Sequence, residues 1–376
     1  MKKGTSLYLD LVRFSAALMV FFEHLREHTR NSFNFFWRAH PLWYSYSSSY
    51  SQTAVIVFFV LSGYVIAHVL ATREKTLLEY SASRFSRLYS VVIPALLLAA
   101  ATNYLEALRY PGAFHEFDSH GPLGVTAYYL GTALFVSHFW LWPDLEPPNL
   151  PFWTLSFEAA YYVGIALFVF AKGRARVLGI ALLCMFAGPT MVLLAPTWLV
   201  GYGAYHLSQR RQLLAGPAMI LWLGSTLLLL SCPIIEVHVR NELSFLRMPD
   251  ASLGGLLASY AAAIAFTVNL LMFNAFADKA EPLFVPFAKS IRWLGSMTFA
   301  LYLFHQPLLS FFTVYSFNDR SSAAQMALLV GGTFLVVATL GRFCERSKGA
   351  YKRFFLSAWG WAATLRPRYA APPAAE

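Results

Sequence analysis

The stretch that decides the fold is LYLDLVRFSAALMVFFEHLREH, residues 7–28. It is long enough to cross a bilayer as a helix, and Arg13 lies deep inside its apolar run. His24 follows eleven residues later, and eleven helical steps of about 100° bring both side chains to one face. A charge at membrane depth costs about 2.5–3.5 kcal/mol on insertion scales, so a functional role is the default interpretation. The alternative is an arginine whose side chain reaches the nearer headgroups, with the histidine in the outer interface.

The composition is that of a multi-pass membrane protein. Hydrophobic residues make up 57% of the 376 residues and charged residues only 13%, against about 25% in soluble proteins. The net charge of +10 would suggest nucleic-acid binding in a soluble protein, but basic cytoplasmic loops account for it here, and we expect no nucleic-acid partner. The three cysteines lie far apart, so neither a disulfide framework nor a metal site is expected.

Candidate membrane spans follow from length and hydropathy, and the positive charges choose among topologies. With a cytoplasmic N-terminus and segment 123–142 kept from crossing, most of the 29 Lys and Arg residues fall on the cytoplasmic side, as the positive-inside rule requires. We therefore expect an all-α polytopic protein with about ten transmembrane helices, both termini cytoplasmic, and 123–142 as a re-entrant or interfacial segment on the outer side. The segments considered are 7–27, 53–72, 90–105, 123–142, 152–171, 176–194, 197–208, 214–232, 252–275, 292–314 and 323–343.

The chain is expected to hold one folded domain. A membrane domain over residues 1–345 would be followed by a basic, partly disordered cytoplasmic tail over residues 346–376. The first helix is too long, and too polar at its outer end, for a cleaved signal peptide, so we expect it to be retained. The span at 197–208 is short and contains Gly201 and Gly203, which favours close helix packing or a break.

Two motifs after the first helix contain residues suited to ligand binding. FFVLSGYVIA, residues 58–67, contains Ser62 and Gly63, small residues that let either a ligand or a neighbouring helix approach closely. In the motif SRFSRLY, Arg84 and Arg87 are three residues apart, on one face of the third helix at its cytoplasmic end. Such a pair is suited to phosphate groups, although an ordinary basic flank of a membrane helix has the same pattern.

Two later motifs add an acidic and an imidazole group. PFWTLSFEAAYY contains Trp153, Ser156 and Glu158. The carboxylate is either a first-turn partner of the helix dipole or a group that orients an imidazole or binds a sugar hydroxyl, with the indole stacking beneath the sugar. LGSMTFALYLFHQPLL contains Tyr302 and His305, and a lone intramembrane histidine is often hydrogen-bonded to a neighbouring helix.

Taken in order, these five motifs resemble those of the acyltransferase 3 family, integral-membrane acyltransferases that modify extracytoplasmic glycans. The matching stretches, RFSAALMVFFEH, FFVLSGYVIA, SRFSRLY, WTLSFEAAYY and LGSMTFALYLFHQPL, extend over most of the membrane domain. The chain departs from the family pattern at Ala159, where a second acidic residue is usual, and in a less basic loop before the third helix.

The resemblance implies a reaction and a donor site. An acyl group, expected to be acetyl, would move from cytoplasmic acyl-CoA, a co-substrate rather than a bound cofactor, to a hydroxyl of an extracytoplasmic glycan or lipid-linked glycan. Arg84 and Arg87 would hold the nucleotide phosphates, and Arg13 the pantetheine arm or a phosphate. The arm would pass Ser62 and Gly63 on its way to the reacting centre. The location implied is a bacterial inner membrane.

The resemblance also implies the catalytic groups. Neutral His24 would act as general base on the acceptor hydroxyl, and Glu158 would orient or tune that imidazole. Glu23 points about 100° away from His24 on the same helix and is a poorer partner. Pocket or acceptor contacts would come from Trp153, Ser156, Tyr302 and His305. Two alternatives remain open: a transporter or flippase whose pathway is lined by Arg13, His24 and Glu158, and an acyltransferase that acts on a secondary metabolite.

Overall fold

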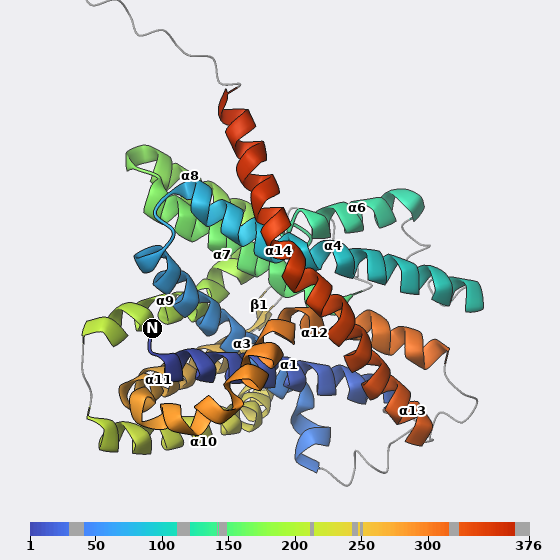
Figure 1. Ribbon diagram of the computed structural model, residues 1–376. Coiled ribbons are helices and arrows are strands. Elements are labelled where there is room, and N and C mark those ends of the chain that lie inside the picture. Colours follow the sequence, from blue (N-terminus) through green and yellow to red (C-terminus); the bar gives the residue numbers. More distant parts are fainter. Residues whose placement is uncertain are drawn as a thin grey trace, which may run out of the picture.

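The computed structural model describes residues 1–29, 41–110, 121–140, 142, 149–210, 214–242, 247–248, 251–315 and 323–364. Within these ranges the chain is a bundle of helices, as the all-α prediction requires (Figure 1). The strands there are β1 (Arg247–Met248) and β2 (Ala251–Ser252), which form one short antiparallel pair. The larger elements are α1 (Lys3–Thr29), α3 (Pro41–Thr72), α4 (Leu77–Arg109), α6 (Gly121–Ala133), η1 (Leu150–Phe152), α7 (Trp153–Phe170), α8 (Gly173–Ala187), α9 (Pro189–Arg210), α10 (Ala215–Glu242), α11 (Leu253–Phe284), η2 (Val285–Phe287), α12 (Ala288–Val314), α13 (Ala323–Ala327), η3 (Leu328–Gly332) and α14 (Thr333–Thr364).

Helix α1 lies between α11, α12 and α3 (Figure 1). Its N-terminal end meets the C-terminal end of α11, where Lys2 Nζ lies 2.7 Å from a carboxylate oxygen of Asp278, so these two helices are antiparallel. Asp10 of α1 pairs with Arg292 of α12 at 2.5 Å, and nearer the C-terminal ends of the same helices His24 contacts His305. Helices α1 and α12 are therefore parallel. Helices α11 and α12 therefore run in opposite directions.

Seven helical stretches of the described chain are long and apolar enough to cross a membrane, or up to eight if α8 and α9 together make one bent span. One of the seven, Gly254–Val314, is 61 residues long and contains the antiparallel helices α11 and α12. A straight helix of that length would extend about three times the thickness of a bilayer core, so this stretch contains more than one crossing. The total of about ten spans, and the side on which the termini lie, stay predictions.

Segment 123–142 is not among the helices that could span a membrane. Helix α6 covers its first part with 13 residues, about 20 Å, which is shorter than a bilayer core of about 30 Å. The helix lies beside α4 (Figure 1), and the Tyr89 hydroxyl donates to the carbonyl of Ala133 at 2.8 Å. The structure therefore agrees with the prediction that this segment does not cross as a helix.

The prediction of separate spans at 176–194 and 197–208 is wrong in detail. Helices α8 and α9 form a pair bent by 119° at a break between them. The break is at Gly188, whose φ of 89° is a conformation that favours glycine, and Pro189 begins the second helix. Helix α9 continues through 197–208, so of the two alternatives for that segment, close packing or a break, the break lies earlier in the chain.

The two glycines of α9 differ from each other. A Cβ atom at Gly201 would lie 2.0 Å from the carbonyl oxygen of Val60 in α3, whereas nothing lies within 4 Å of a Cβ at Gly203. Gly63 makes the reciprocal contact, since its Cβ would lie 2.1 Å from the carbonyl oxygen of Trp198. Close packing of α3 on α9 thus explains Gly63 and Gly201.

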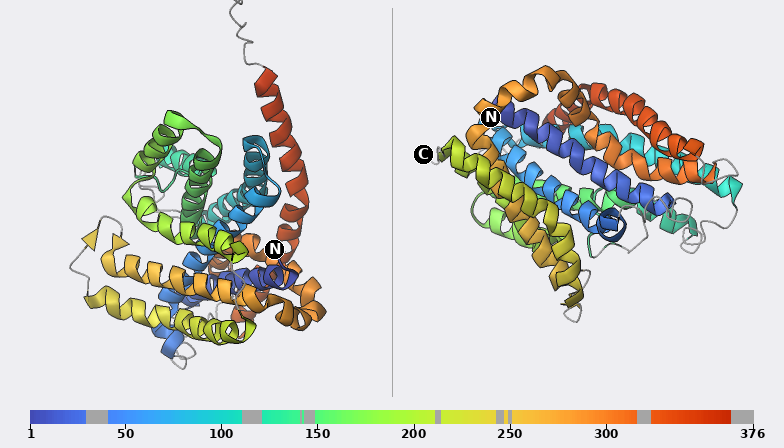
Figure 2. Two further views of the ribbon diagram at one scale, coloured as in Figure 1. Left: turned by 90° about the vertical axis from the view of Figure 1, so that its left-hand side faces the viewer. Right: turned by 90° about the horizontal axis from the view of Figure 1, so that it is seen from below.

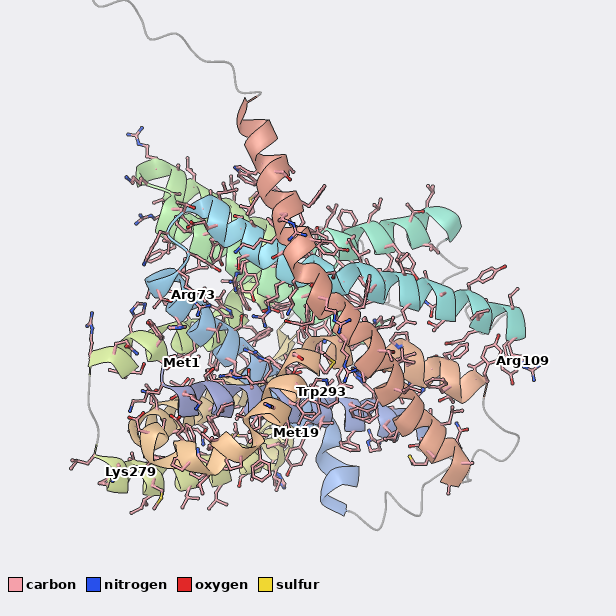
Figure 3. All side chains as sticks on the ribbon, in the orientation of Figure 1. Met1, Met19, Arg73, Arg109, Lys279 and Trp293 are labelled. Atoms are coloured by element: carbon pink, nitrogen blue, oxygen red, sulfur yellow. The ribbon has the colours of Figure 1, made fainter. Side chains whose placement is uncertain are left out.

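Helix ends that the sequence assigns to one side of the membrane lie together. In Figure 3, Met1, Arg73 and Lys279 lie toward one side of the view and Arg109, at the far end of α4, lies at the opposite side. Helix α14 continues past residue 345 to Thr364, so the first part of the expected tail is helical; residues 365–376 lie outside the described chain.

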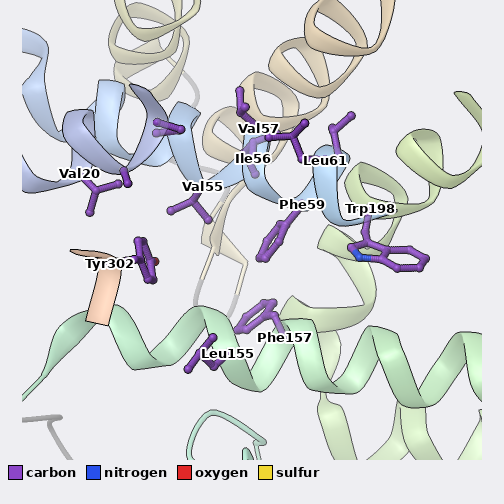
Figure 4. Packing of buried hydrophobic residues seen from close by; sticks show 14 of the residues in the cluster. Val20, Val55, Ile56, Val57, Phe59, Leu61, Leu155, Phe157, Trp198 and Tyr302 are labelled. Carbon is purple, nitrogen blue, oxygen red and sulfur yellow. The ribbon is translucent and has the colours of Figure 1, made fainter. Parts of the chain in front are cut away.

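The site described next is enclosed by apolar packing between α3 and α7. Figure 4 shows Val55 and Phe59 of α3 pointing toward Leu155 and Phe157 of α7. All four are nearly fully buried, as expected for helices without a polar face. The opposite flank of the molecule is a pair of long helices, α10 and α11, side by side (Figure 2). The polar residues of the site are therefore the exception within a hydrophobic bundle.

Candidate active site

A cavity of about 70 Å³ lies where α1, α3, α4, α7 and α12 meet. Apolar side chains form much of its wall, including Phe58 and Phe59. Its polar lining brings together residues from all five motifs and from all five helices. These polar residues are Arg13, Ser62, Arg87, Thr154, Glu158, Tyr162, Thr298 and Tyr302.

Glu158 is held in the cavity wall by two hydroxyl groups. Its Oε1 accepts a hydrogen bond from Ser62 Oγ at 3.2 Å and another from the Tyr162 hydroxyl. Glu158 and Tyr162 are four residues apart on α7 and so share a face, while Ser62 comes from α3. The carboxylate is thus fixed between two helices, and its charge interacts with that of Arg13.

The two arginines of the cavity have few partners of their own. Arg13 lies 3.7 Å from Asp10 Oδ1, and the other oxygen of Asp10 is bound by Arg292 at 2.5 Å. Among the described residues, the side chain of Arg87 has neither an ion-pair partner nor a hydrogen bond. Two guanidinium groups near one cavity, one weakly paired and one unpaired, are suited to an anionic ligand that accepts from both.

Arg84 is placed differently from its neighbour three residues later. It forms an ion pair with Glu74 at 2.7 Å, and both side chains are buried. Its guanidinium also lies 5.7 Å from the ring centre of Tyr80 and 5.8 Å from that of Tyr162. The structure does not bring Arg84 to the cavity wall, so the expected pair of phosphate-binding arginines is split.

His24 and His305 form a stacked pair. His24 Nδ1 and His305 Nε2 are 2.7 Å apart, with the ring centres 4.9 Å apart and the planes 14° from parallel. His305 is fully buried, and its Nδ1 lies 2.8 Å from the carbonyl oxygen of Leu301. The expectation that Glu158 orients His24 finds no contact in the described residues, because the imidazole is bonded to His305.

Tyr302 connects the cavity to this histidine pair. Its ring lines the cavity, and its ring centre is 6.4 Å from that of His305. The hydroxyl is fixed by Thr154 Oγ1 at 3.0 Å. Glu23, the acidic neighbour of His24, is paired with Arg26 at 3.0 Å. This agrees with the expectation that Glu23 is a poor partner for the His24 imidazole.

Besides Arg84 and the two histidines, three further sequence candidates lie away from the cavity wall. Gly63 packs against the backbone of α9, as described above. Ser156 Oγ is 3.1 Å from Ser137 Oγ in the turn after α6, and it is buried there. Trp153 packs edge-on against Phe157, with the ring centres 5.2 Å apart. The structure therefore does not gather these three with Glu158.

Sequence reasoning missed four polar residues of this region: Thr154, Tyr162 and Thr298 in the cavity wall, and Lys348 beside it. Tyr162 could have been found from its spacing of four from Glu158. Lys348 of α14 lies near enough to Arg13 and Arg87 for the charges to interact, and α14 packs on α4 there through Phe355. The signal for Lys348 was a run of basic residues that we assigned to the cytoplasmic tail. Within the described part of the chain, no group of three or more His, Cys, Asp or Glu residues could hold a metal ion.

Comparison with known proteins identifies the family. The family model described as an acyltransferase domain, that of the acyltransferase 3 family, matches residues 6–342. No curated protein and no solved structure matches the chain. The match covers all five sequence motifs and every helix of the cavity. The chain therefore belongs to the acyltransferase 3 family, and it is an integral, multi-pass membrane acyltransferase.

Proposed function

We propose that this protein moves a short acyl group, acetyl by preference, from cytoplasmic acyl-CoA to a hydroxyl of an extracytoplasmic glycan. The acceptor is a surface polysaccharide or a lipid-linked glycan, and the location a bacterial inner membrane. The observation that carries the proposal is the arrangement along α1: a cavity with two under-paired arginines, followed through Tyr302 by a hydrogen-bonded histidine pair. Such an arrangement supplies an anion site and a base in one hydrophobic bundle.

The arginine cavity is the proposed donor site. Arg87 and Arg13 would attract the phosphates or the polar arm of acyl-CoA, with Lys348 adding positive charge from α14. Ser62 and Tyr162, held by Glu158, would give the arm polar contacts where it passes between the helices.

The histidine pair is the proposed catalytic centre. Neutral His24 takes the proton of the acceptor hydroxyl as its oxygen attacks the thioester carbonyl carbon. The new C–O bond forms, the C–S bond breaks, and the departing CoA thiolate receives the proton from the imidazolium. His24 is only partly buried, so an acceptor can reach it, whereas His305 is fully enclosed.

The direct test is acceptor-dependent release of CoA thiol from acetyl-CoA by the protein in nanodiscs, with polysaccharide extracted from the host envelope as acceptor. We expect release by the wild type and none above background by His24→Ala. His68→Ala is the matched control, because His68 is another histidine of a membrane helix, and its Nδ1 lies 3.4 Å from the Tyr205 hydroxyl rather than in the His24–His305 pair. Absence of both turnover and acetyl-CoA binding in the wild type would favour the transporter alternative.

A further inference from the structure

The hydrogen bonds of the histidine pair have a direction, and that direction determines which nitrogen atom of His24 is the base. We infer that His305 is a positioning residue that holds His24 in the Nδ1–H tautomer and so leaves Nε2 as the proton acceptor. This inference rests on the proposed function for its chemical meaning. The tautomer itself is a property of the resting protein and can be measured without any turnover.

The first step is the state of His305. Its Nδ1 lies 2.8 Å from the carbonyl oxygen of Leu301, and a carbonyl oxygen can only accept, so Nδ1 carries a proton. His305 is fully buried against Phe21 and within the α1–α12 contact, where an unpaired imidazolium would be costly. The nearby carboxylate of Glu23 is already bound by Arg26. The ring is therefore neutral, with a lone pair on Nε2.

The second step passes this constraint to His24. Since His305 Nε2 can only accept, the 2.7 Å contact requires a proton on His24 Nδ1. A neutral His24 then has its lone pair on Nε2, which has no hydrogen bond within the described chain. The backbone of α12, through one neutral ring, thus selects one of the two tautomers of the base on α1.

The arrangement has a chemical consequence beyond orientation. In the opposite tautomer, His24 would present an N–H to the acceptor hydroxyl and could not take its proton. When Nε2 does accept the proton, the imidazolium keeps its Nδ1–H bonded to a neutral acceptor rather than to a carboxylate. His305 therefore serves the base as an orienting group without adding a negative charge, which suits a site buried in a bilayer.

Two amide substitutions at position 305 separate positioning from packing. In His305→Gln the amide oxygen reaches the place of Nε2 and can still accept from His24. In His305→Asn the same amide is shorter, reaches only the place of Nδ1, and leaves His24 without its acceptor. We expect His305→Asn to lower the turnover of acetyl-CoA with envelope polysaccharide by about 10²-fold or more, within the range that a general base contributes, and His305→Gln to keep most of it.

The dissociation constant for acetyl-CoA should be unchanged in both variants, because neither touches the arginine cavity. Equal turnover losses in Gln and Asn variants that bind acetyl-CoA normally would overturn the positioning role. His68→Gln, at a histidine outside the pair, is the control: it measures how far turnover falls when an amide replaces an imidazole elsewhere in a membrane helix.

The tautomer can be read directly by ¹⁵N solid-state NMR of histidine-labelled protein in lipid bilayers, with His24→Ala used to assign the His24 signals. We expect a protonated Nδ1 and an unprotonated Nε2 at His24 in the wild type and in His305→Gln. In His305→Asn we expect a mixture of both tautomers. A wild-type His24 protonated on Nε2 would overturn the inference even if the protein transfers acyl groups. The expected tautomer in a protein that never turns over would count against the proposed function alone.

Discussion

The arginine cavity and the histidine pair are both polar regions inside the same hydrophobic bundle, but the first contains charged groups and the second contains neutral ones. The cavity contains charged groups, and its two cations are only partly neutralised, by Asp10 at 3.7 Å from Arg13 and by the carboxylate of Glu158. The histidine pair is closely packed, uses neutral rings, and has one hydrogen bond whose direction is fixed by the backbone. The difference teaches that a binding site for an anion needs positive charge that the protein's own carboxylates do not neutralise, whereas a histidine base needs a neutral ring held in one tautomer.

The largest expected effect comes from removing the base. In His24→Ala, turnover should fall by about 10²–10⁴-fold, because proton transfer in the transition state is lost. The dissociation constant of acetyl-CoA should stay the same, since the arginine cavity is intact. Thiol release and isothermal titration on the same nanodisc preparation measure the two quantities. A loss of donor binding equal to the loss of turnover would mean that the two regions are not separable.

Next in size is the loss of the unpaired guanidinium. Arg87→Ala should weaken acetyl-CoA binding by about 10–100-fold, because one hydrogen bond to a charged group contributes about 1.5–3 kcal/mol. Turnover at saturating acetyl-CoA should stay nearly constant. Arg87→Lys should recover part of the affinity, since a point charge replaces a bidentate fork.

Arg109→Ala is the control for that experiment, because it removes an exposed arginine from the other end of the same helix. Arg84→Ala should behave differently from Arg87→Ala, since it leaves Glu74 buried without its partner and should chiefly reduce stability. Equal losses of acetyl-CoA affinity in Arg84→Ala and Arg87→Ala would instead support the pair of phosphate-binding arginines predicted from the sequence.

A smaller effect, of opposite sign on binding, is expected at the carboxylate. Glu158→Gln removes a negative charge that repels an anionic donor, so acetyl-CoA should bind somewhat more tightly. Turnover should fall by about tenfold, because the amide holds the hydroxyls of Ser62 and Tyr162 less firmly than a carboxylate does. Measuring affinity and turnover at several donor concentrations separates these effects. Weaker binding in this variant would contradict the assignment of the cavity to an anion.

The smallest effect on catalysis is expected from packing glycines. Gly201→Ala places a methyl group against the carbonyl of Val60 and should lower the free energy of unfolding by about 1–3 kcal/mol, as overpacking does. Gly203→Ala, two residues away with open space around it, should be neutral or stabilising by up to about 1 kcal/mol. Thermal unfolding in detergent compares them. Equal stability of the two variants would show that α3 and α9 are not in close contact.

Much of the fold followed from the sequence because hydropathy and charge act over whole segments. The helices predicted at residues 7–27 and 53–72 and the non-crossing segment 123–142 are of this kind. The break at Gly188 was missed because we judged these spans by hydropathy, although glycine followed by proline at 188–189 is a sequence signal for a turn. The antiparallel arrangement of α11 and α12 follows from the consecutive spans predicted at 252–275 and 292–314, whereas the contact of Lys2 with Asp278 shows which end of α11 meets α1.

The candidate site was predictable as a set of residues but not as a set of contacts. Helical spacing placed Arg84 and Arg87 on one face, yet only the tertiary structure shows that Glu74 neutralises Arg84. Similarly, His24 and His305 are on different helices, so no spacing rule could pair them. Interactions between helices decide which charges remain available, and those interactions are set by packing.

The measurement that tests the central claim most directly is transfer across a sealed membrane. Right-side-out vesicles containing the protein would hold acetyl-labelled CoA inside and envelope polysaccharide outside, so that neither substrate reaches the other except through the protein. The account predicts labelled polysaccharide outside with the wild type, and none with His24→Ala. Label that stays on the enclosed CoA in the presence of folded wild type, or equal transfer by the variant, would contradict it.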